Sequence, residues 1–321
     1  MNGPFRCADT ARERDDPLVG TAAPARRWLL IEHPGPWATD ALASSGIDLG
    51  VQSTLRASAG AAGARILLVR RPGRAGQAAP DRADEPRAWA VIDHASGAPS
   101  VWGTWRADGD LLAAAMALDP ERAPSGVTHP ATEPVLLVCT HGRHDTCCAL
   151  RGRPVAAALA EHWPDWTWEC SHVGGDRFAA NVVLLPDGAY YGYLDPPSAV
   201  RTVQGHLRGQ VEVEFLRGLS TEPPIVQAAV VAAMQRWGPC GARAFRSEQL
   251  GPVLSDPNGG AWSVELAGRP QDGVPARVSA TVRRTTRAAE LLTCQARSAV
   301  AATAYEVTDL REVADVEHGA G

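Results

Sequence analysis

The sequence predicts an α/β fold in which one βαβ–ββα unit occurs twice and a small α+β region follows. Three observations lead to this prediction. Short apolar runs with strand character alternate with longer, helix-compatible stretches through residues 27–212. The order of these elements in residues 27–120 returns in residues 130–212. Segments rich in proline and glycine separate the elements, where loops are expected.

The first unit, residues 27–120, is expected to run from a strand through a helix and three strands to a second helix. Its predicted elements are strand Trp28–Glu32, a helical stretch near Trp37–Ser44, strands Arg65–Val69, Trp89–Asp93 and Val101–Trp105, and helix Gly109–Leu118. The proline, glycine and arginine content of Arg70–Arg87 predicts a loop. Residues 1–26 are polar, charged and broken by prolines, which predicts a disordered leader in which Cys7 has no role.

The second unit, residues 130–212, repeats this order. Its predicted elements are strand Val135–Val138, helix Pro154–Trp163, strands Trp166–Cys170, Val182–Leu185 and Ala189–Leu194, and helix Ser198–Leu207. The segment Pro186-Asp187-Gly188 is a hairpin turn signal between the last two strands. In both units the order of elements is that of a thioredoxin-like fold, with a mixed sheet covered by helices.

The third region, residues 222–311, is expected to form an α+β region. Its predicted elements are helix Ile225–Trp237 and strands Ala261–Ala267, Ala276–Arg284 and Thr303–Val307. Cys240 and Cys294 are isolated in this region, and an isolated cysteine is usually a small buried hydrophobe. We therefore expect no function from either thiol.

The basic residues exclude several enzyme classes, because all 31 of them are arginine. Without lysine the chain has no Schiff-base nucleophile, no anchor for pyridoxal phosphate and no phosphate-binding lysine of the Walker or kinase type. The formal net charge is −5, and the sequence has no basic block. We therefore expect no nucleic acid partner.

The apolar residues and the cysteines indicate the cellular location of the protein and the kind of chemistry that it carries out. The sequence has no apolar run long enough to span a membrane and no signal peptide pattern, so we expect a cytoplasmic protein with no membrane partner. It has seven cysteines, an odd number, and four of them lie in one segment. This clustering favours metal or redox chemistry over a disulfide framework.

That segment, residues 135–194, also holds four of the nine histidines. Cys139 directly follows an apolar run, and Cys147 and Cys148 end the polar loop that comes next. A second apolar run ends at Cys170 and His172. Two junctions between a strand and a loop therefore have metal-binding side chains that could meet at one point.

Three motifs in this segment resemble those of a known family. They are C-T-H-G-R-H-D-T-C-C from Cys139 to Cys148, S-H-V-G-G-D-R-F-A-A-N from Ser171 to Asn181, and L-P-D-G-A-Y-Y-G ending at Gly192. The chain resembles the sucrase/ferredoxin-like proteins, whose core is a thioredoxin-like [2Fe-2S] ferredoxin domain. The resemblance is close over residues 130–210 and loose over most of the rest.

The resemblance implies a [2Fe-2S] cluster with mixed ligands. The family pattern has two cysteines with eight residues between them, which are Cys139 and Cys148 here, and an H-x-x-x-H pair. His172 fits the first histidine of that pair, whereas Asp176 stands at the second. Histidine ligation raises the reduction potential of such a cluster, as it does in Rieske centres.

Several neighbouring residues have alternative interpretations. Cys170 competes with Asp176 for the fourth ligand position. Cys147 is expected to be a buried hydrophobe, because neighbouring residues point apart. His141 and His144 are expected to hydrogen-bond to backbone rather than to bind metal. Arg143 or Arg177 could offset the charge of the cluster; the list of implied ligands remains Cys139, Cys148, His172 and Asp176.

Four functions follow from these observations. The favoured one is a one-electron carrier with a [2Fe-2S] cluster and unidentified redox donor and acceptor proteins, rather than a stand-alone enzyme. A second is a structural or regulatory zinc site formed by Cys139, Cys148, Cys170 and His172, whose thiolate and imidazole donors zinc also accepts. A thiol oxidoreductase is disfavoured by the absence of C-x-x-C. A thioredoxin-fold binding module with a decayed site is the fourth.

Overall fold

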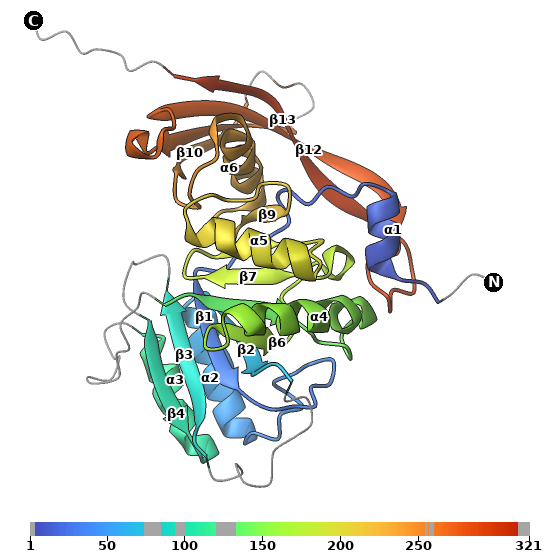
Figure 1. Ribbon diagram of the computed structural model, residues 1–321, viewed down its shortest axis with the longest axis vertical. Helices are drawn as coiled ribbons and strands as arrows, with labels where there is room; N and C mark the ends of the chain where they lie inside the picture. The colour runs from blue at the N-terminus through green and yellow to red at the C-terminus, as the bar shows by residue number, and fades with distance from the viewer. Residues whose placement is uncertain are drawn as a thin grey trace, which may run out of the picture.

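The computed structural model describes residues 4–73, 85–93, 100–119, 133–253, 256 and 260–313. These residues form a nine-stranded mixed sheet and a separate four-stranded antiparallel sheet (Figure 1). The described residues also form six α-helices. Within the described residues, no helix is both long and apolar enough to cross a membrane.

The first unit has the predicted thioredoxin-like topology. Its elements are β1 (Arg27–Glu32), α2 (Leu49–Ala61), β2 (Ala64–Arg70), β3 (Arg87–Asp93), β4 (Val101–Trp105) and α3 (Leu112–Ala117). The strands lie in the order β4-β3-β1-β2. Strands β1 and β2 are parallel, and the other two pairings are antiparallel.

The second unit repeats that topology. Its elements are β5 (Val135–Cys139), α4 (Thr146–His162), β6 (Thr167–Cys170), β7 (Val182–Leu185), β8 (Ala189–Tyr191) and α5 (Pro196–Leu207). The strands lie in the order β6-β5-β7-β8, again with one parallel pair followed by two antiparallel pairs. The two units join through antiparallel β2 and β6, so their sheets form one continuous sheet. The predicted duplication is confirmed.

The C-terminal region extends the core of the second unit. It consists of β9 (Leu216–Leu219), α6 (Pro224–Trp237), β10 (Phe245–Pro252), β11 (Ala261–Gly268), β12 (Arg277–Glu290) and β13 (Val300–Glu312). Strand β9 pairs with β8 at the edge of the large sheet. Helix α6 lies between the two sheets, and one apolar core runs from β5 through α5 and α6 to β12. The predicted α+β character is confirmed, whereas β9 and β10 were not predicted.

The N-terminal segment is not the predicted disordered leader. Residues Cys7–Glu13 form helix α1, and Cys7, Ala8 and Ala11 are fully buried. The backbone N–H groups of Gly20 and Thr21 then donate to the carbonyl of Arg217 in β9. The prediction was wrong because small residues and distant contacts, rather than a local apolar pattern, bury this segment.

The first helix of the first unit begins later than predicted. No helix forms at residues 37–44, because the side chains of Asp40 and Ser44 accept hydrogen bonds from nearby backbone N–H groups and stabilise turns. Helix α2 starts instead after Asp48, whose carboxylate accepts from the N–H of Val51 at 3.0 Å and caps the helix.

Helix α4 begins at Thr146, eight residues before the predicted start at Pro154. Asp145 caps it by accepting a hydrogen bond from the N–H of Cys147 at 2.8 Å. Pro154 lies inside the helix, whereas the sequence analysis had placed it at the first helical position. Cys147 and Cys148 therefore lie in the first helical turn, not at the end of a loop.

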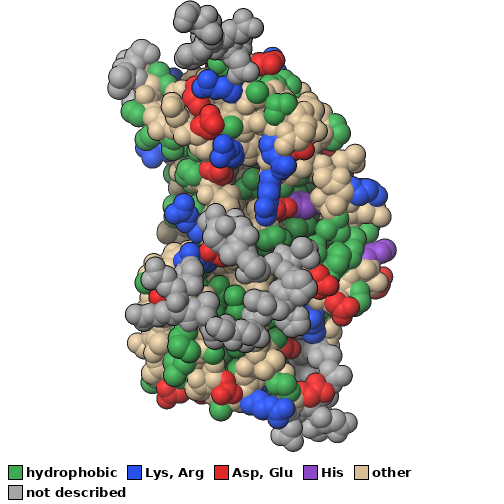
Figure 2. All heavy atoms as spheres, turned by 90° about the vertical axis from the view of Figure 1, so that its left-hand side faces the viewer, with side chains coloured by type: hydrophobic (Ala, Val, Ile, Leu, Met, Phe, Trp, Pro, Cys, Tyr) green, Lys and Arg blue, Asp and Glu red, His purple; other side chains and the backbone are tan. Residues whose placement is uncertain are grey.

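The surface seen in Figure 2 combines both signs of charge. Arginine side chains and carboxylates are interspersed over the described part of this face. This arrangement limits the local electrostatic potential, because neighbouring opposite charges screen one another.

Two helical glycines provide a test of how tightly α4 packs. A Cβ at Gly152 would clash with the carbonyl oxygen of Cys139, whereas a Cβ at Gly60 in α2 meets nothing within 4 Å. We expect Gly152→Ala to destabilise the protein by about 2 kcal/mol or more through overpacking. Gly60→Ala should be neutral or stabilising by up to about 1 kcal/mol. Urea unfolding midpoints measure both; equal midpoints would contradict the close contact between α4 and β5.

Candidate metal centre

Strand β5 and helix α4 bring two thiols together. Cys139 is the last residue of β5, and Cys148 lies in the first turn of α4. The connecting loop is tight, because the carbonyl of His141 accepts hydrogen bonds from the N–H groups of both His144 and Asp145. The helix therefore starts directly above the end of the strand.

The loop after β6 brings two further donors to the same edge of the sheet. Strands β5 and β6 are parallel, and Cys139 lies opposite Cys170. The loops that follow them therefore leave the sheet side by side. Gly174 and Gly175 have positive φ angles of 97° and 79°, which a residue with a Cβ rarely adopts. This turn directs Asp176 back toward His172.

The four residues expected to bind the cluster lie together. The ligand atoms of Cys139, Cys148 and His172 are all within 4.8 Å of one another. Asp176 Oδ1 lies 3.1 Å from Cys148 Sγ and 3.0 Å from His172 Nδ1. Cys139, Cys148 and Asp176 are buried, and 26% of the His172 side chain is exposed. The group therefore reaches the surface through its imidazole.

Charges in this group favour one thiolate and one imidazolium. The hydrogen bond from Cys148, supported by His172, holds the pKa of Cys139 well below its usual range. Burial disfavours the charged form of His172, but Asp176 and Cys139 outweigh it and raise the pKa of His172 to about 9. Burial likewise opposes ionisation of Asp176, yet His172 lowers the pKa of that carboxyl. The charged forms of Cys139, His172 and Asp176 therefore favour one another.

His144 joins this group, which the sequence analysis did not predict, although its Nδ1 also lies 3.4 Å from the carbonyl oxygen of Thr39, a backbone contact as predicted. Its ring stacks on that of His172 with 3.7 Å between ring centroids, and its Nε2 lies 3.8 Å from Asp176 Oδ2. His141 contacts backbone, as predicted: its Nε2 lies 2.7 Å from the carbonyl oxygen of Ala38. The H-x-x-H spacing of these two histidines was the only signal in the sequence, and it did not distinguish them.

Cys170 occupies a different environment from the four expected ligands. It is fully buried at the end of β6, and burial raises the pKa of its thiol well above the usual value. Among the described residues, its sulfur does not fall within the group formed by Cys139, Cys148 and His172. Its position is that of a core residue.

Arg217, which the sequence analysis did not identify, lies beside the glycine turn of the group. It is fully buried in β9 and donates to the carbonyl oxygen of Gly174 at 2.9 Å and to Asn181 Oδ1 at 2.8 Å. Its charge interacts with Asp176 and Cys139. Arg177 was one of two arginines that could offset the charge of the cluster, and its Nε lies 3.4 Å from Asp16 Oδ2.

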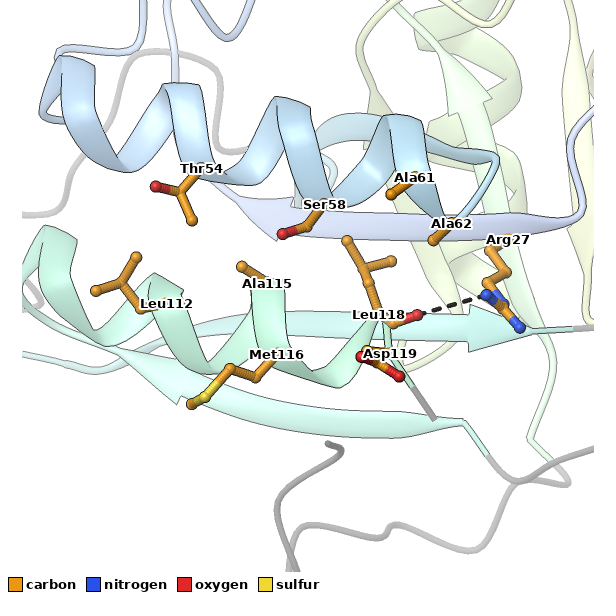
Figure 3. Close-up of a pocket in the computed structure, with 10 residues that line it drawn as sticks. All are labelled: Arg27, Thr54, Ser58, Ala61, Ala62, Leu112, Ala115, Met116, Leu118 and Asp119. Atoms are coloured by element: carbon orange, nitrogen blue, oxygen red, sulfur yellow. Dashed lines mark hydrogen bonds between the residues drawn. The ribbon is translucent and has the colours of Figure 1, made fainter. Parts of the chain in front are cut away.

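Two pockets of the described structure bear on the choice of a functional site. A pocket of about 270 Å³ is lined by His141, His144 and His172, together with residues of the 39–42 loop and β2. It opens onto the exposed edge of the candidate metal centre. A larger pocket of about 590 Å³ lies between α2 and α3, where Arg27 donates to the carbonyl oxygen of Leu118 (Figure 3). Its described lining has no thiol or imidazole, so we assign no site there.

Substitution of Arg217 tests how the glycine turn is held. Arg217→Gln would leave the buried carbonyl of Gly174 and the amide oxygen of Asn181 without their charged donor, and we expect it to destabilise the protein by about 3 kcal/mol or more. The control is Arg56→Gln, which removes a half-exposed ion pair with Asp40 and should cost less than about 1 kcal/mol. Urea unfolding measures both. If the two variants unfold at the same midpoint, Arg217 does not support the turn.

Comparison with known proteins identifies the family. Two solved structures resemble parts of the chain: a thioredoxin-like [2Fe-2S] ferredoxin from Aquifex aeolicus and a cysteine-to-serine variant of it. The ferredoxin is 24% identical, with 28% of this chain and 94% of that chain covered and a TM-score of 0.24. The variant is 22% identical, with 26% and 97% covered and a TM-score of 0.23. No curated protein matches the chain. The model of the sucrase/ferredoxin-like family matches residues 18–218, more than half of the sequence, and the chain therefore belongs to that family.

Proposed function

We propose that this protein is a one-electron carrier whose [2Fe-2S] cluster is held by Cys139, Cys148, His172 and Asp176. The observation that carries the proposal is the convergence of two thiols, an imidazole and a carboxylate from two neighbouring loops. Membership of the sucrase/ferredoxin-like family supports it.

The donors suit the two kinds of iron position that the cluster requires. Thiolates are the usual protein ligands of iron–sulfur clusters, and imidazole replaces them at the more solvent-accessible iron of Rieske centres. The buried thiols and the partly exposed His172 follow the same division. When bound, the cluster would accept and release a single electron. Cys148 and His172 would each lose a proton to become ligands.

Arg217 and the glycine turn would then support the bound group. The buried guanidinium places a positive charge beside the thiolate and carboxylate donors, which stabilises the reduced, more negative state. It also holds the carbonyl of Gly174, so the turn that carries His172 and Asp176 keeps its position. Both effects follow from residues outside the ligand set.

Electron exchange would take place at the histidine edge. The side chains of His144 and His172 are 29% and 26% exposed, whereas the two thiols are buried. The proposed redox donor and acceptor proteins would therefore dock over these two rings.

All seven cysteines are free thiols, which agrees with the proposed cytoplasmic location.

A zinc site is the second candidate function. Cys139, Cys148 and His172, with either Asp176 or His144 as the fourth ligand, provide a donor set that tetrahedral zinc accepts. A zinc-bound protein would have no visible absorption and no redox activity. Metal analysis of the purified protein separates this candidate from the [2Fe-2S] proposal.

The first test is the metal content of protein purified without oxygen from iron-sufficient cells. We expect red-brown protein with about two irons and two acid-labile sulfides per chain. Cys139→Ser and Cys148→Ser should each lose most of the visible absorption, because each removes a thiolate ligand. Cys240→Ser, a buried thiol elsewhere, and Cys147→Ser should retain it. Colourless protein with one zinc lost in the Cys139 and Cys148 variants would favour the second candidate.

A second test identifies the fourth ligand. If Asp176 binds iron, Asp176→His removes a negative charge from the cluster and should raise its reduction potential by tens of millivolts, where about 59 mV is a tenfold one-electron shift. The potential should also depend more steeply on pH, since a second imidazole can take up a proton on reduction. Redox titration measures both quantities.

The controls for this titration are His144→Ala and Cys170→Ala. Loss of the cluster in His144→Ala, with an unchanged potential in Asp176→Ala, would assign the fourth position to His144. Loss in Cys170→Ala alone would assign it to Cys170. Carboxylate ligation is excluded if both Asp176 variants keep the potential of the original protein.

A further inference from the structure

Three cysteines that the sequence analysis left without a function lie together beside the candidate metal centre. Cys7 comes from α1, Cys147 from the first turn of α4, and Cys294 from the connection between β12 and β13. The carboxylate of Asp145 completes the group, and the four ligand atoms are within 4.8 Å of one another. Segments separated by up to 287 residues therefore meet at one point.

The separations within the group resemble the edges of a tetrahedron around zinc. With Zn–S bonds of 2.3 Å, neighbouring sulfurs are about 3.8 Å apart, and a sulfur and a carboxylate oxygen are about 3.5 Å apart. Cys294 Sγ lies 3.4 Å from Cys147 Sγ and 3.5 Å from Cys7 Sγ. Cys7 Sγ lies 3.5 Å from Asp145 Oδ2. Small movements of the side chains would admit one ion.

Neither a disulfide nor an ion pair accounts for this arrangement. Cys294 is about equally close to two thiols, so one disulfide would leave the third sulfur and the carboxylate unused. Asp145 is fully buried, and within the described ranges no arginine forms an ion pair with it. Among the described residues, its oxygens accept from the thiol of Cys7 and from the N–H groups of Cys147 and Cys294, the latter two at 2.8 and 2.6 Å. A buried carboxylate favours a nearby cation.

We propose that Cys7, Cys147, Cys294 and Asp145 form a second metal site, which binds one structural zinc ion. On binding, the three thiols release their protons to solvent and become thiolates, and the carboxylate supplies the fourth ligand. Thiolate-rich tetrahedral donors select zinc over calcium and magnesium, which require oxygen ligands. The N–H groups that donate to Asp145 would fix the orientation of this ligand.

The zinc would join both ends of the chain to the second unit. Helix α1 lies beside the long β12–β13 hairpin in Figure 1, and Arg14 is 3.6 Å from Glu290 at this contact. Gln295 Nε2 donates to the carbonyl oxygen of Arg143, so the hairpin also reaches the loop between β5 and α4. A metal at Cys147 would thus stabilise the loop that positions Cys148.

Metal analysis of the full-length protein tests this proposal. We expect about one zinc per chain in protein purified with a chelator wash, in addition to any iron. Cys7→Ser combined with Cys294→Ser should lower zinc more than tenfold. Cys139→Ser combined with Cys148→Ser should lose any iron and sulfide and keep the zinc. Cys240→Ser is the matched control and should change neither metal.

Cobalt provides a spectroscopic measurement in the Cys139→Ser, Cys148→Ser protein, where the other thiol site is removed. Co²⁺ added to the zinc-free form should give visible bands of a tetrahedral thiolate complex, and these bands should disappear when Cys294→Ser is added. The proposal is overturned by any of three results: no zinc in the original protein, zinc that is lost with Cys139 and Cys148 instead, or a Cys147–Cys294 disulfide found by mass spectrometry. If the first site holds zinc instead of iron, the original protein should contain about two zincs, and each of the two double variants should lose one zinc and keep the other.

Discussion

The parallel pairing of β5 with β6 is the constraint on which the candidate metal centre depends. Because Cys139 lies opposite Cys170, both strands end at the same level of the sheet, and their loops leave it side by side. The thiols of the first loop therefore meet the imidazole and carboxylate of the second. A register shift of one residue would turn the side chain of Cys139 to the opposite face and separate these donors.

The first unit has the same fold as the second, and it covers one side of the candidate metal centre. Its β2 pairs with β6, and the buried ion pair between Arg70 and Glu169, 2.8 Å apart, crosses this junction. The loop after β1 then covers the histidine edge, since the carbonyl of Ala38 lies 2.7 Å from His141 Nε2. The pocket beside His144 and His172 is consequently formed by both units. The second unit thus carries the four candidate ligands, and the first unit covers part of the surface beside them.

Local patterns predicted the strands better than the helices or the distant contacts. The strand Val182–Leu185 was predicted with its observed bounds, because four apolar residues between turn signals leave few alternatives. Cys139, Cys148, His172 and Asp176 were selected as candidate ligands because they match a family motif and follow the ends of two predicted strands. Arg217 and the buried state of Cys7 could not be predicted in this way. Their partners lie in other segments, such as Asp145, which is 138 residues from Cys7.

The first turn of α4 connects the two groups of thiols. Consecutive residues of a helix point about 100° apart, so Cys148 faces Asp176 at 3.1 Å while Cys147 faces Cys294 at 3.4 Å. Asp145 caps this turn and also belongs to the Cys147 group. A change in the position of Asp145 therefore moves the start of the helix and both thiols with it. The N-terminal segment and the C-terminal hairpin contact Asp145 through Cys7 and Cys294, and they therefore contact the residue that caps the helical turn of Cys148.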